Sequence, residues 1–203
     1  MQIRDNYSLQ AQQAKGAFLR HDQQSLIRKL NLNADENYLY TRLFSCPYRI
    51  CRTTGDLQRW ADAAWVDANT HSEIMTLMDL ICDSREDRKL SFRWRDMVSF
   101  GHMFHRQLQE QDPWAKRFDK DPQGLHRACR TLGGVPFEKG DVAYTIEVFD
   151  GMPLVLQLWR GDEEFPANLR LMWDENALMY LKYETMYFAR ALLLRRIREE
   201  MDK

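Results

Sequence analysis

The chain has 203 residues, of which 44% are apolar and 12% aromatic, so it has ample material for a core and is not a disordered chain. Its 29 basic and 30 acidic residues nearly cancel, without the basic excess typical of nucleic-acid-binding proteins. Mean hydropathy is −0.60, and no apolar run approaches the length of a membrane span. The N-terminus has no apolar secretory signal, and the four cysteines form no CxxC pair. We therefore expect a cytoplasmic protein with reduced thiols, and neither nucleic acid nor a membrane among its partners.

The N-terminal part of the chain is expected to be helical. Residues 7–21 show a weak apolar helical face, formed by Ala14, Ala17 and Phe18. Asp22 is a suitable N-cap for a second helix.

A hairpin is expected next. Residues 37–44 are rich in β-forming side chains and predict a strand, which Ser45-Cys46-Pro47 should break. Residues 48–52 then look like its hairpin partner, closed by Gly55-Asp56. Residues 57–69 are ambiguous, because their tryptophans and alanines fit a helical face while tertiary context can override that pattern.

Two helices have clear boundary signals. Thr70-His71-Ser72-Glu73 has the spacing of a capping box, and apolar residues follow it at helical intervals. After a charged connector, residues 100–108 show another helical face. Asp121-Pro122 marks the start of a further helix, and Gly133-Gly134 marks its end.

The clearest pattern in the chain is an antiparallel meander of three strands. Val142, Tyr144 and Ile146 alternate with other residues at the period of two that a half-buried strand shows. Asp150-Gly151 is a hairpin dipeptide, because such turns need residues that tolerate positive φ. The three strands are expected at residues 142–149, 152–159 and 168–174, with an acidic loop at 160–166.

The end of the chain completes the expected fold. Residues 179–181 look short and extended, and residues 182–201 predict a long C-terminal helix. The elements do not alternate as βαβ units, so the sequence predicts an α+β fold in which helices pack on an antiparallel sheet. We expect a single domain over residues 1–203, with a helical segment at 1–35 and a body at 36–203.

Several motifs occur in a fixed order: Leu132-Gly133-Gly134, Gly140-Asp141, the block Gly161-Asp162-Glu163-Glu164-Phe165-Pro166, and Tyr180-Leu181. In this order they resemble the bacterial and archaeal family called domain of unknown function 3786. The likeness is best from Leu132 onward and weaker back to Asn37. Proteins of that family come largely from anaerobes, and some carry an iron–sulfur domain ahead of this one. The resemblance implies no activity, and it implies no iron–sulfur cluster in this chain, which lacks the cysteines for one.

The acidic loop is the first candidate site. Asp162, Glu163 and Glu164, with Asp174 and Glu184 downstream, could converge as a carboxylate cluster. Such a cluster binds a hard cation, or supplies an acid and a base where burial raises one pKa. The alternative is a solvated bend in which Asp162 accepts hydrogen bonds from backbone amides. On an extended chain only Asp162 and Glu164 can share a side.

Histidines and cysteines offer weaker candidates. His102 and His105 lie three residues apart on an expected helix and could be two ligands of a metal, but this spacing has little specificity, and we expect no metal site. Cys46 and Cys51 could face each other across a hairpin as a redox pair; ordinary half-buried thiols are the alternative.

Aromatic residues exceed what a plain core of this size needs. Trp94 lies between Arg93 and Arg95, a basic-aromatic cluster that suits a planar anionic ligand through stacking and charge. Core packing, with arginine covering one face of the tryptophan, is the alternative.

The sequence contains no nucleophile elbow, phosphate loop or dinucleotide fingerprint. We therefore predict a non-enzymatic module that binds a small molecule or cofactor, which the sequence does not identify, between sheet and helices. Its candidate ligand-binding residues are Arg93, Trp94, Arg95, Trp159, Asp162, Glu164 and Asp174. Two alternatives stay open: an enzyme that uses Asp162, Glu164 or Asp174, with or without a divalent metal, and an interaction scaffold that binds a protein partner or a second copy of itself.

Overall fold

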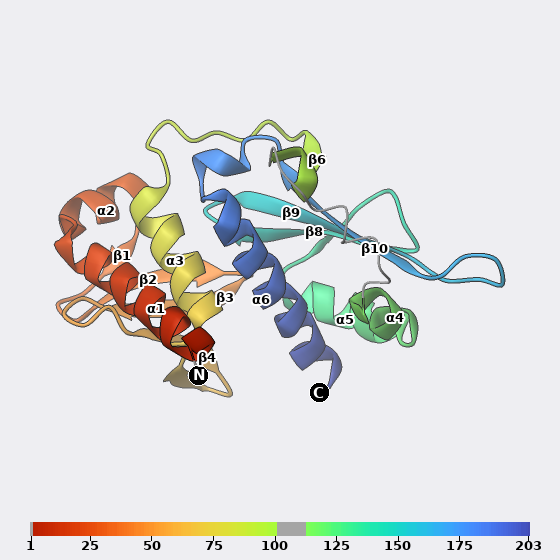
Figure 1. Ribbon diagram of the computed structural model, residues 1–203, viewed down its shortest axis with the longest axis horizontal. Coiled ribbons are helices and arrows are strands. Elements are labelled where there is room, and N and C mark those ends of the chain that lie inside the picture. The colour runs from red at the N-terminus through yellow and green to blue at the C-terminus, as the bar shows by residue number, and fades with distance from the viewer. Residues whose placement is uncertain (1, 101–112) are drawn as a thin grey trace. The chain divides into compact units, whose positions relative to one another are not determined.

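The structure is a computed structural model that describes residues 2–100 and 113–203 (Figure 1). It contains helices and two antiparallel five-stranded sheets, which confirms the α+β class predicted from the sequence. The chain divides into two compact units, Met1–Lys89 with Leu178–Leu192, and Leu90–Ala177 with Leu193–Lys203. The predicted hairpin and the predicted meander lie in separate sheets, one in each unit. The single domain over residues 1–203 stays a prediction.

The first unit is built from three N-terminal helices, a meander and residues 178–192, which include the first half of the C-terminal helix. Its helices are α1 (Gln2–Arg20), α2 (Gln23–Leu30) and α3 (His71–Asp83), and its strands are β1 (Asn33–Ala34), β2 (Tyr38–Leu43), β3 (Cys46–Cys51), β4 (Leu57–Ala61) and β5 (Ala64–Asp67). Each strand pairs antiparallel with the next one in sequence. Helix α1 packs along α3, as Figure 1 shows.

The helix boundaries follow the predicted capping residues. Asp22 accepts a 3.1 Å hydrogen bond from the amide of Gln24 at the start of α2, and Asn31 ends that helix in the left-handed conformation. Thr70 caps α3, and its hydroxyl donates to Glu73 at 2.6 Å. The buried Glu73 also accepts a 3.0 Å hydrogen bond from the Tyr48 hydroxyl on β3, so the capping box joins α3 to the sheet.

Two features of this meander differ from the expected ones. Pro47 does not interrupt the hairpin but lies within β3, where it pairs with Arg42. The turn is formed by Phe44 and Ser45, slightly before the expected break at Ser45-Cys46-Pro47. Residues 57–69 form the hairpin β4–β5, so the helical interpretation of their tryptophans is wrong. Trp60 and Trp65 are directly paired across it.

The second unit holds the other sheet, in the order β6-β10-β9-β8-β7. Its elements are β6 (Trp94–Asp96), the 3-10 turn η1 (Met97–Phe100), α4 (Pro113–Asp119), α5 (Pro122–Thr131), β7 (Val135–Pro136), β8 (Val142–Phe149), β9 (Met152–Trp159) and β10 (Asn168–Asp174). Strands β8, β9 and β10 have the predicted bounds, and Asp150 and Gly151 take positive φ in the predicted turn. The helical face expected at residues 100–108 lies, apart from Phe100, outside the described residues.

The central strands are more deeply buried than a half-exposed meander would be. All residues of β9 except Trp159 are buried, and Ala143 and Phe149 of β8 are buried on the side expected to face solvent. Since strand residues point alternately to the two faces, both faces of this sheet are covered at β9.

The last elements are the 3-10 turn η3 (Ala177–Met179) and α6 (Tyr183–Met201). The turn replaces the extended segment expected near Met179, and α6 confirms the predicted C-terminal helix. Asp79 of α3 fixes the start of α6, because it accepts a 2.7 Å hydrogen bond from the backbone amide of Lys182. Among the helices that the structure describes, none has the length and hydropathy needed to cross a membrane.

Candidate functional site

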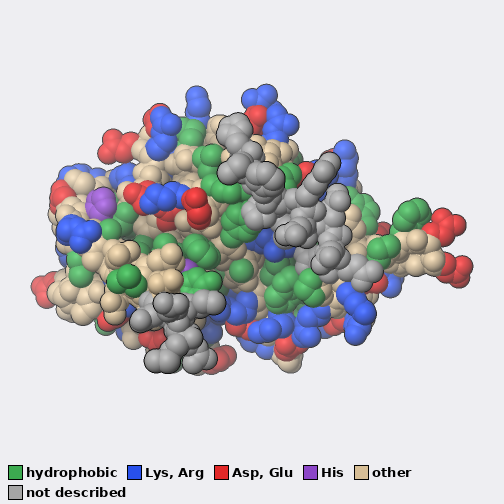
Figure 2. Space-filling view, in the orientation of Figure 1, with side chains coloured by type: hydrophobic (Ala, Val, Ile, Leu, Met, Phe, Trp, Pro, Cys, Tyr) green, Lys and Arg blue, Asp and Glu red, His purple; other side chains and the backbone are tan. Residues whose placement is uncertain are grey.

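The acidic loop is a solvated bend between β9 and β10. Asp162 accepts hydrogen bonds from the amides of Phe165 at 2.7 Å and Glu164 at 2.9 Å, and these bonds lower the pKa of its carboxyl. Residues 162–166 are all exposed. The loop projects from its sheet in Figure 1, and Figure 2 shows acidic side chains gathered at its tip.

Asp174 lies at the other end of β10, where it is completely buried. Its carboxylate accepts hydrogen bonds from the amides of Phe92 at 2.7 Å, Asn176 at 2.8 Å and Ser91 at 3.1 Å, and from the Ser91 hydroxyl at 3.0 Å. Six residues of strand separate it from Asn168, beside the acidic loop, which corresponds to about 20 Å. Asp162 and Asp174 therefore do not form the carboxylate cluster considered from the sequence, and the bend at Asp162 has the geometry of the alternative.

The predicted basic-aromatic cluster lies near Asp174 but is already neutralised. Arg93 and Arg95 both pair with Glu175, at 2.8 Å and 2.7 Å, and Arg95 is the main cause of the lowered pKa of that carboxyl. Trp94 packs edge-on against Phe137, with ring centroids 6.1 Å apart. Glu175 compensates both cations, and the Trp94 ring packs against Phe137. This geometry agrees with the alternative given for the sequence, in which Trp94 serves packing.

The seven predicted ligand-binding residues thus fall into two groups. Trp159, Asp162 and Glu164 belong to the loop end of the sheet, where Trp159 pairs with Asn168. The remaining four residues, Arg93, Trp94, Arg95 and Asp174, belong to the opposite end of β10. Binding at either group stays a prediction.

The structure describes the candidate redox pair Cys46 and Cys51 but not the candidate metal ligands His102 and His105. His102 and His105 lie outside the described residues. Within the described ranges, no group of three His, Cys, Asp or Glu side chains is placed to hold a metal ion. Cys46 and Cys51 lie at the two ends of the same strand, about 17 Å apart, so they do not form the redox pair considered from the sequence.

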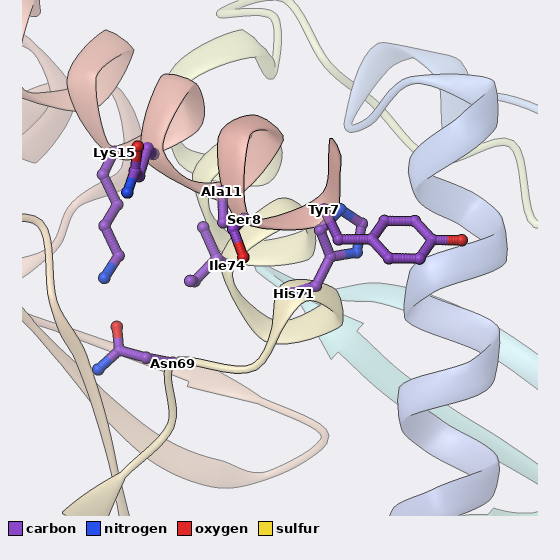
Figure 3. A pocket seen from close by; sticks show the side chains of 8 residues that line it. Tyr7, Ser8, Ala11, Lys15, Asn69, His71 and Ile74 are labelled. Atoms are coloured by element: carbon purple, nitrogen blue, oxygen red, sulfur yellow. The ribbon is translucent and has the colours of Figure 1, made fainter. Parts of the chain in front are cut away.

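A pocket of about 240 Å³ lies in the first unit, beside the middle of α1. One face of α1 forms one wall, and the start of α3 with the preceding loop forms the other (Figure 3). Its lining residues are Tyr7, Ser8, Ala11, Gln12, Lys15, Asn69, His71 and Ile74. None of these residues was a candidate from the sequence, although His71 lies inside the predicted capping box.

Aromatic rings form one end of the pocket. His71 lies 4.7 Å from Tyr7 and 4.9 Å from Phe188 between ring centroids, and its Nε2 contacts Gln10 Oε1 at 2.9 Å. Burial lowers the pKa of His71, so its imidazole is neutral at pH 7. Figure 3 shows Tyr7 and His71 together at this end.

A cation lies at the other end. Lys15 extends from α1 toward Asn69 in Figure 3, and its side chain is only 19% exposed. Its ammonium donates to Asp56 Oδ1 at 2.6 Å. The Asn69 amide is used internally, because it bonds the backbone of Leu57 and holds the start of β4. Among the lining residues Lys15 is thus the one that is charged at neutral pH, and Asp56 already pairs with it.

The arrangement suits one kind of molecule. Ala11 and Ile74 lie between the two ends and give an apolar floor to the middle of the pocket (Figure 3). A small compound with a ring at one end and an anionic group at the other would satisfy the aromatic end, the floor and Lys15 together. A sheltered lysine binds a carboxylate more strongly than one in bulk water does.

Comparison with known protein families gives one match. The profile of domain of unknown function 3786 matches residues 22–196 of the chain. No curated protein and no solved structure matches it. The match begins after α1, so the pocket combines three residues inside the matched range with five that precede it.

Proposed function

The chain belongs to the family of domain of unknown function 3786, and we propose that it acts as a non-enzymatic module that binds a small carboxylate-bearing molecule. The site is the pocket between α1 and α3. The observation that carries the proposal is the sheltered ammonium of Lys15 at one end of a pocket whose other end is aromatic.

Asp56 would compete with a bound carboxylate for the ammonium group of Lys15. The Asp56 side chain is about half exposed and lies in the connection between β3 and β4, whereas Lys15 lines the pocket. A bound carboxylate would share the ammonium with Asp56, since an ammonium group has three donors. Removing the charge of Asp56 should then strengthen binding, whereas removing Lys15 should weaken it.

Benzoate and benzylamine are matched probes, because they carry the same ring and opposite charges. We expect benzoate to bind saturably and to shift the backbone NMR signals of Ala11, Asn69 and Ile74, while benzylamine does not. Asp56→Asn should tighten benzoate binding, and Lys15→Gln should weaken it about tenfold. Equal binding of the two probes would contradict the role of Lys15.

A variant that fills the pocket tests the location. Ala11→Phe places a ring inside the pocket and should abolish benzoate binding. Gln13→Phe adds the same ring to an exposed position of the same helix and should leave binding unchanged. Native mass spectrometry of the freshly purified protein and of Ala11→Phe then shows whether a natural ligand copurifies only where the pocket is open.

A second candidate function, docking to a protein, is favoured by the tip of the β9–β10 loop. The Phe165 side chain is 67% exposed there, in a bend fixed by the hydrogen bonds of Asp162. If the tip joins two copies of the chain, sedimentation equilibrium will show concentration-dependent association that Phe165→Ser removes.

A further inference from the structure

The outer face of the first sheet carries a dense group of aromatic rings. One face of this sheet, with Leu39, Tyr48, Ile50 and Leu57, is buried. Strand alternation and the cross-strand pairs place another set of residues together on the other face. This set, called the aromatic face below, consists of Tyr38, Tyr40, Arg49, Gln58, Trp60 and Trp65.

The rings of the aromatic face contact one another across several strands. Tyr40 of β2 lies 6.2 Å from Trp65 of β5 between centroids, although three strand spacings, about 14 Å, separate those strands. Trp60 packs against Trp65 at 5.4 Å in an edge-to-face arrangement, and its side chain remains 43% exposed. The rings therefore lean together over β3 and β4 and leave one indole open to solvent.

Arg49 lies at the centre of these rings. Its guanidinium carbon is 4.1 Å from the Tyr38 ring centroid and 4.6 Å from that of Trp65, and its Nε donates to Gln58 at 2.7 Å. Two rings and one hydrogen bond thus fix the orientation of a planar cation.

In the part of the chain that the structure describes, no carboxylate forms a direct ion pair with Arg49, although the Arg49 charge helps to lower the pKa of Asp35 from a greater distance. The carboxylates of Asp35 and Asp67, which lie near this face, accept hydrogen bonds from other groups. Asp35 accepts hydrogen bonds from the Tyr40 hydroxyl at 2.6 Å and from the Tyr38 amide at 2.7 Å. Asp67 accepts one from the Asn69 side chain at 2.6 Å. This contrasts with Arg93 and Arg95, which share Glu175.

We infer that the aromatic face binds a planar ring compound that carries an anionic group, as a nucleoside monophosphate does. The ring stacks on the exposed indole of Trp60, and the phosphate pairs with Arg49, which the Trp65 ring contacts. The balanced net charge of the chain favours a single nucleotide over a long polyanion.

Isothermal titration calorimetry with adenosine 5′-monophosphate, adenosine and inorganic phosphate tests the inference on the full chain. We expect saturable binding of the monophosphate, at least tenfold weaker binding of adenosine, and weaker binding still of phosphate. Trp60→Ala should reduce affinity about five- to hundredfold, the range found when one base loses its stacking partner. Arg49→Gln should reduce monophosphate affinity to that of adenosine.

Matched variants separate a local effect from a general one. Arg42→Gln removes a charge from the same face away from the rings, and Phe92→Ala removes an exposed ring from the other unit; neither should change affinity more than twofold. Circular dichroism verifies that each variant is folded, and Arg49→Lys retains the charge if Arg49→Gln does not fold. Absent binding, or binding that Trp60→Ala leaves unchanged, overturns the inference. A single-stranded DNA octamer that binds more than tenfold tighter than the monophosphate also overturns it, in favour of a strand-binding surface.

Discussion

Ser91 and Asp174 are joined by three hydrogen bonds of 3.0–3.1 Å, two from the Ser91 amide and one from its hydroxyl. Because the Asp174 carboxylate is fully buried, it satisfies the backbone that leads into β6. An acid that looked like a candidate ligand from the sequence thus holds a loop.

Asp174→Asn is expected to destabilise the protein by about 2–3 kcal/mol, because an amide cannot accept all of these bonds and places donors against donors. Urea unfolding measures the loss. Asp162→Asn, in the exposed bend, should destabilise the protein much less than Asp174→Asn does. Similar losses in the two variants would contradict the structural role of Asp174.

Stability should depend on pH through His71. Burial holds its pKa below the value in the unfolded chain, so the unfolded state binds a proton first as pH falls. The free energy of unfolding is therefore expected to decrease as pH falls from about 6.5 toward the pKa of His71 in the folded state. At higher pH His71 should make no contribution to the pH dependence. Urea unfolding at pH 7.5 and pH 5.5 should show a larger decrease for the wild type than for His71→Gln. Parallel decreases in the two proteins would show that His71 is not responsible.

Tyr48 and Thr70 should be energetically coupled through Glu73. Thr70→Ala removes the cap of α3 and should lower stability by about 1 kcal/mol, and Tyr48→Phe should lower it by about 1–2 kcal/mol. Both variants weaken hydrogen bonds to the same buried carboxylate, so the double variant should differ from the sum by at least about 0.5 kcal/mol. Strict additivity in urea unfolding would contradict the shared network.

Cys51 should react faster than Cys82 and Cys129. The hydroxyls of Thr53 and Thr54 lower the pKa of Cys51 to about 7, whereas burial raises the pKa of Cys82 and of Cys129 to about 12. At pH 7 iodoacetamide is expected to alkylate Cys51 before either of them, since the thiolate is the nucleophile. Peptide mass mapping identifies the labelled site, and Thr53→Val should slow its labelling. Labelling of Cys129 in the native protein ahead of Cys51 would contradict the expectation.

The sequence predicted the fold wherever the chain uses residues suited to its local geometry. Asp150-Gly151 takes positive φ as such a turn requires, and β8–β10 were predicted with their bounds. The turns at Phe44-Ser45 and Asp62-Ala63 also have positive φ but contain no glycine. Because no glycine marks these turns, the turn of the β2–β3 hairpin was predicted slightly too late in the chain. The segment of the β4–β5 hairpin was left open to a helical interpretation.

The candidate site was harder to predict because it depends on distant pairs. Arg93 and Arg95 looked like free cations next to Trp94. Glu175, which directly follows the neighbouring strand β10, pairs with both of them. The basic-aromatic arrangement expected there occurs instead around Arg49, whose ring neighbours come from β2 and β5. Only the cross-strand register reveals that the arginine between aromatic rings and without a direct ion pair is Arg49.

Helix α1 supplies most of the pocket wall, while the body that it covers lies in the family-matched range. If the pocket binds a ligand as proposed, substitutions on one helical stripe at positions 7, 8, 11, 12 and 15 would alter which compound is accepted without replacing any residue of the matched body. Selectivity would then diversify separately from the architecture that supports it.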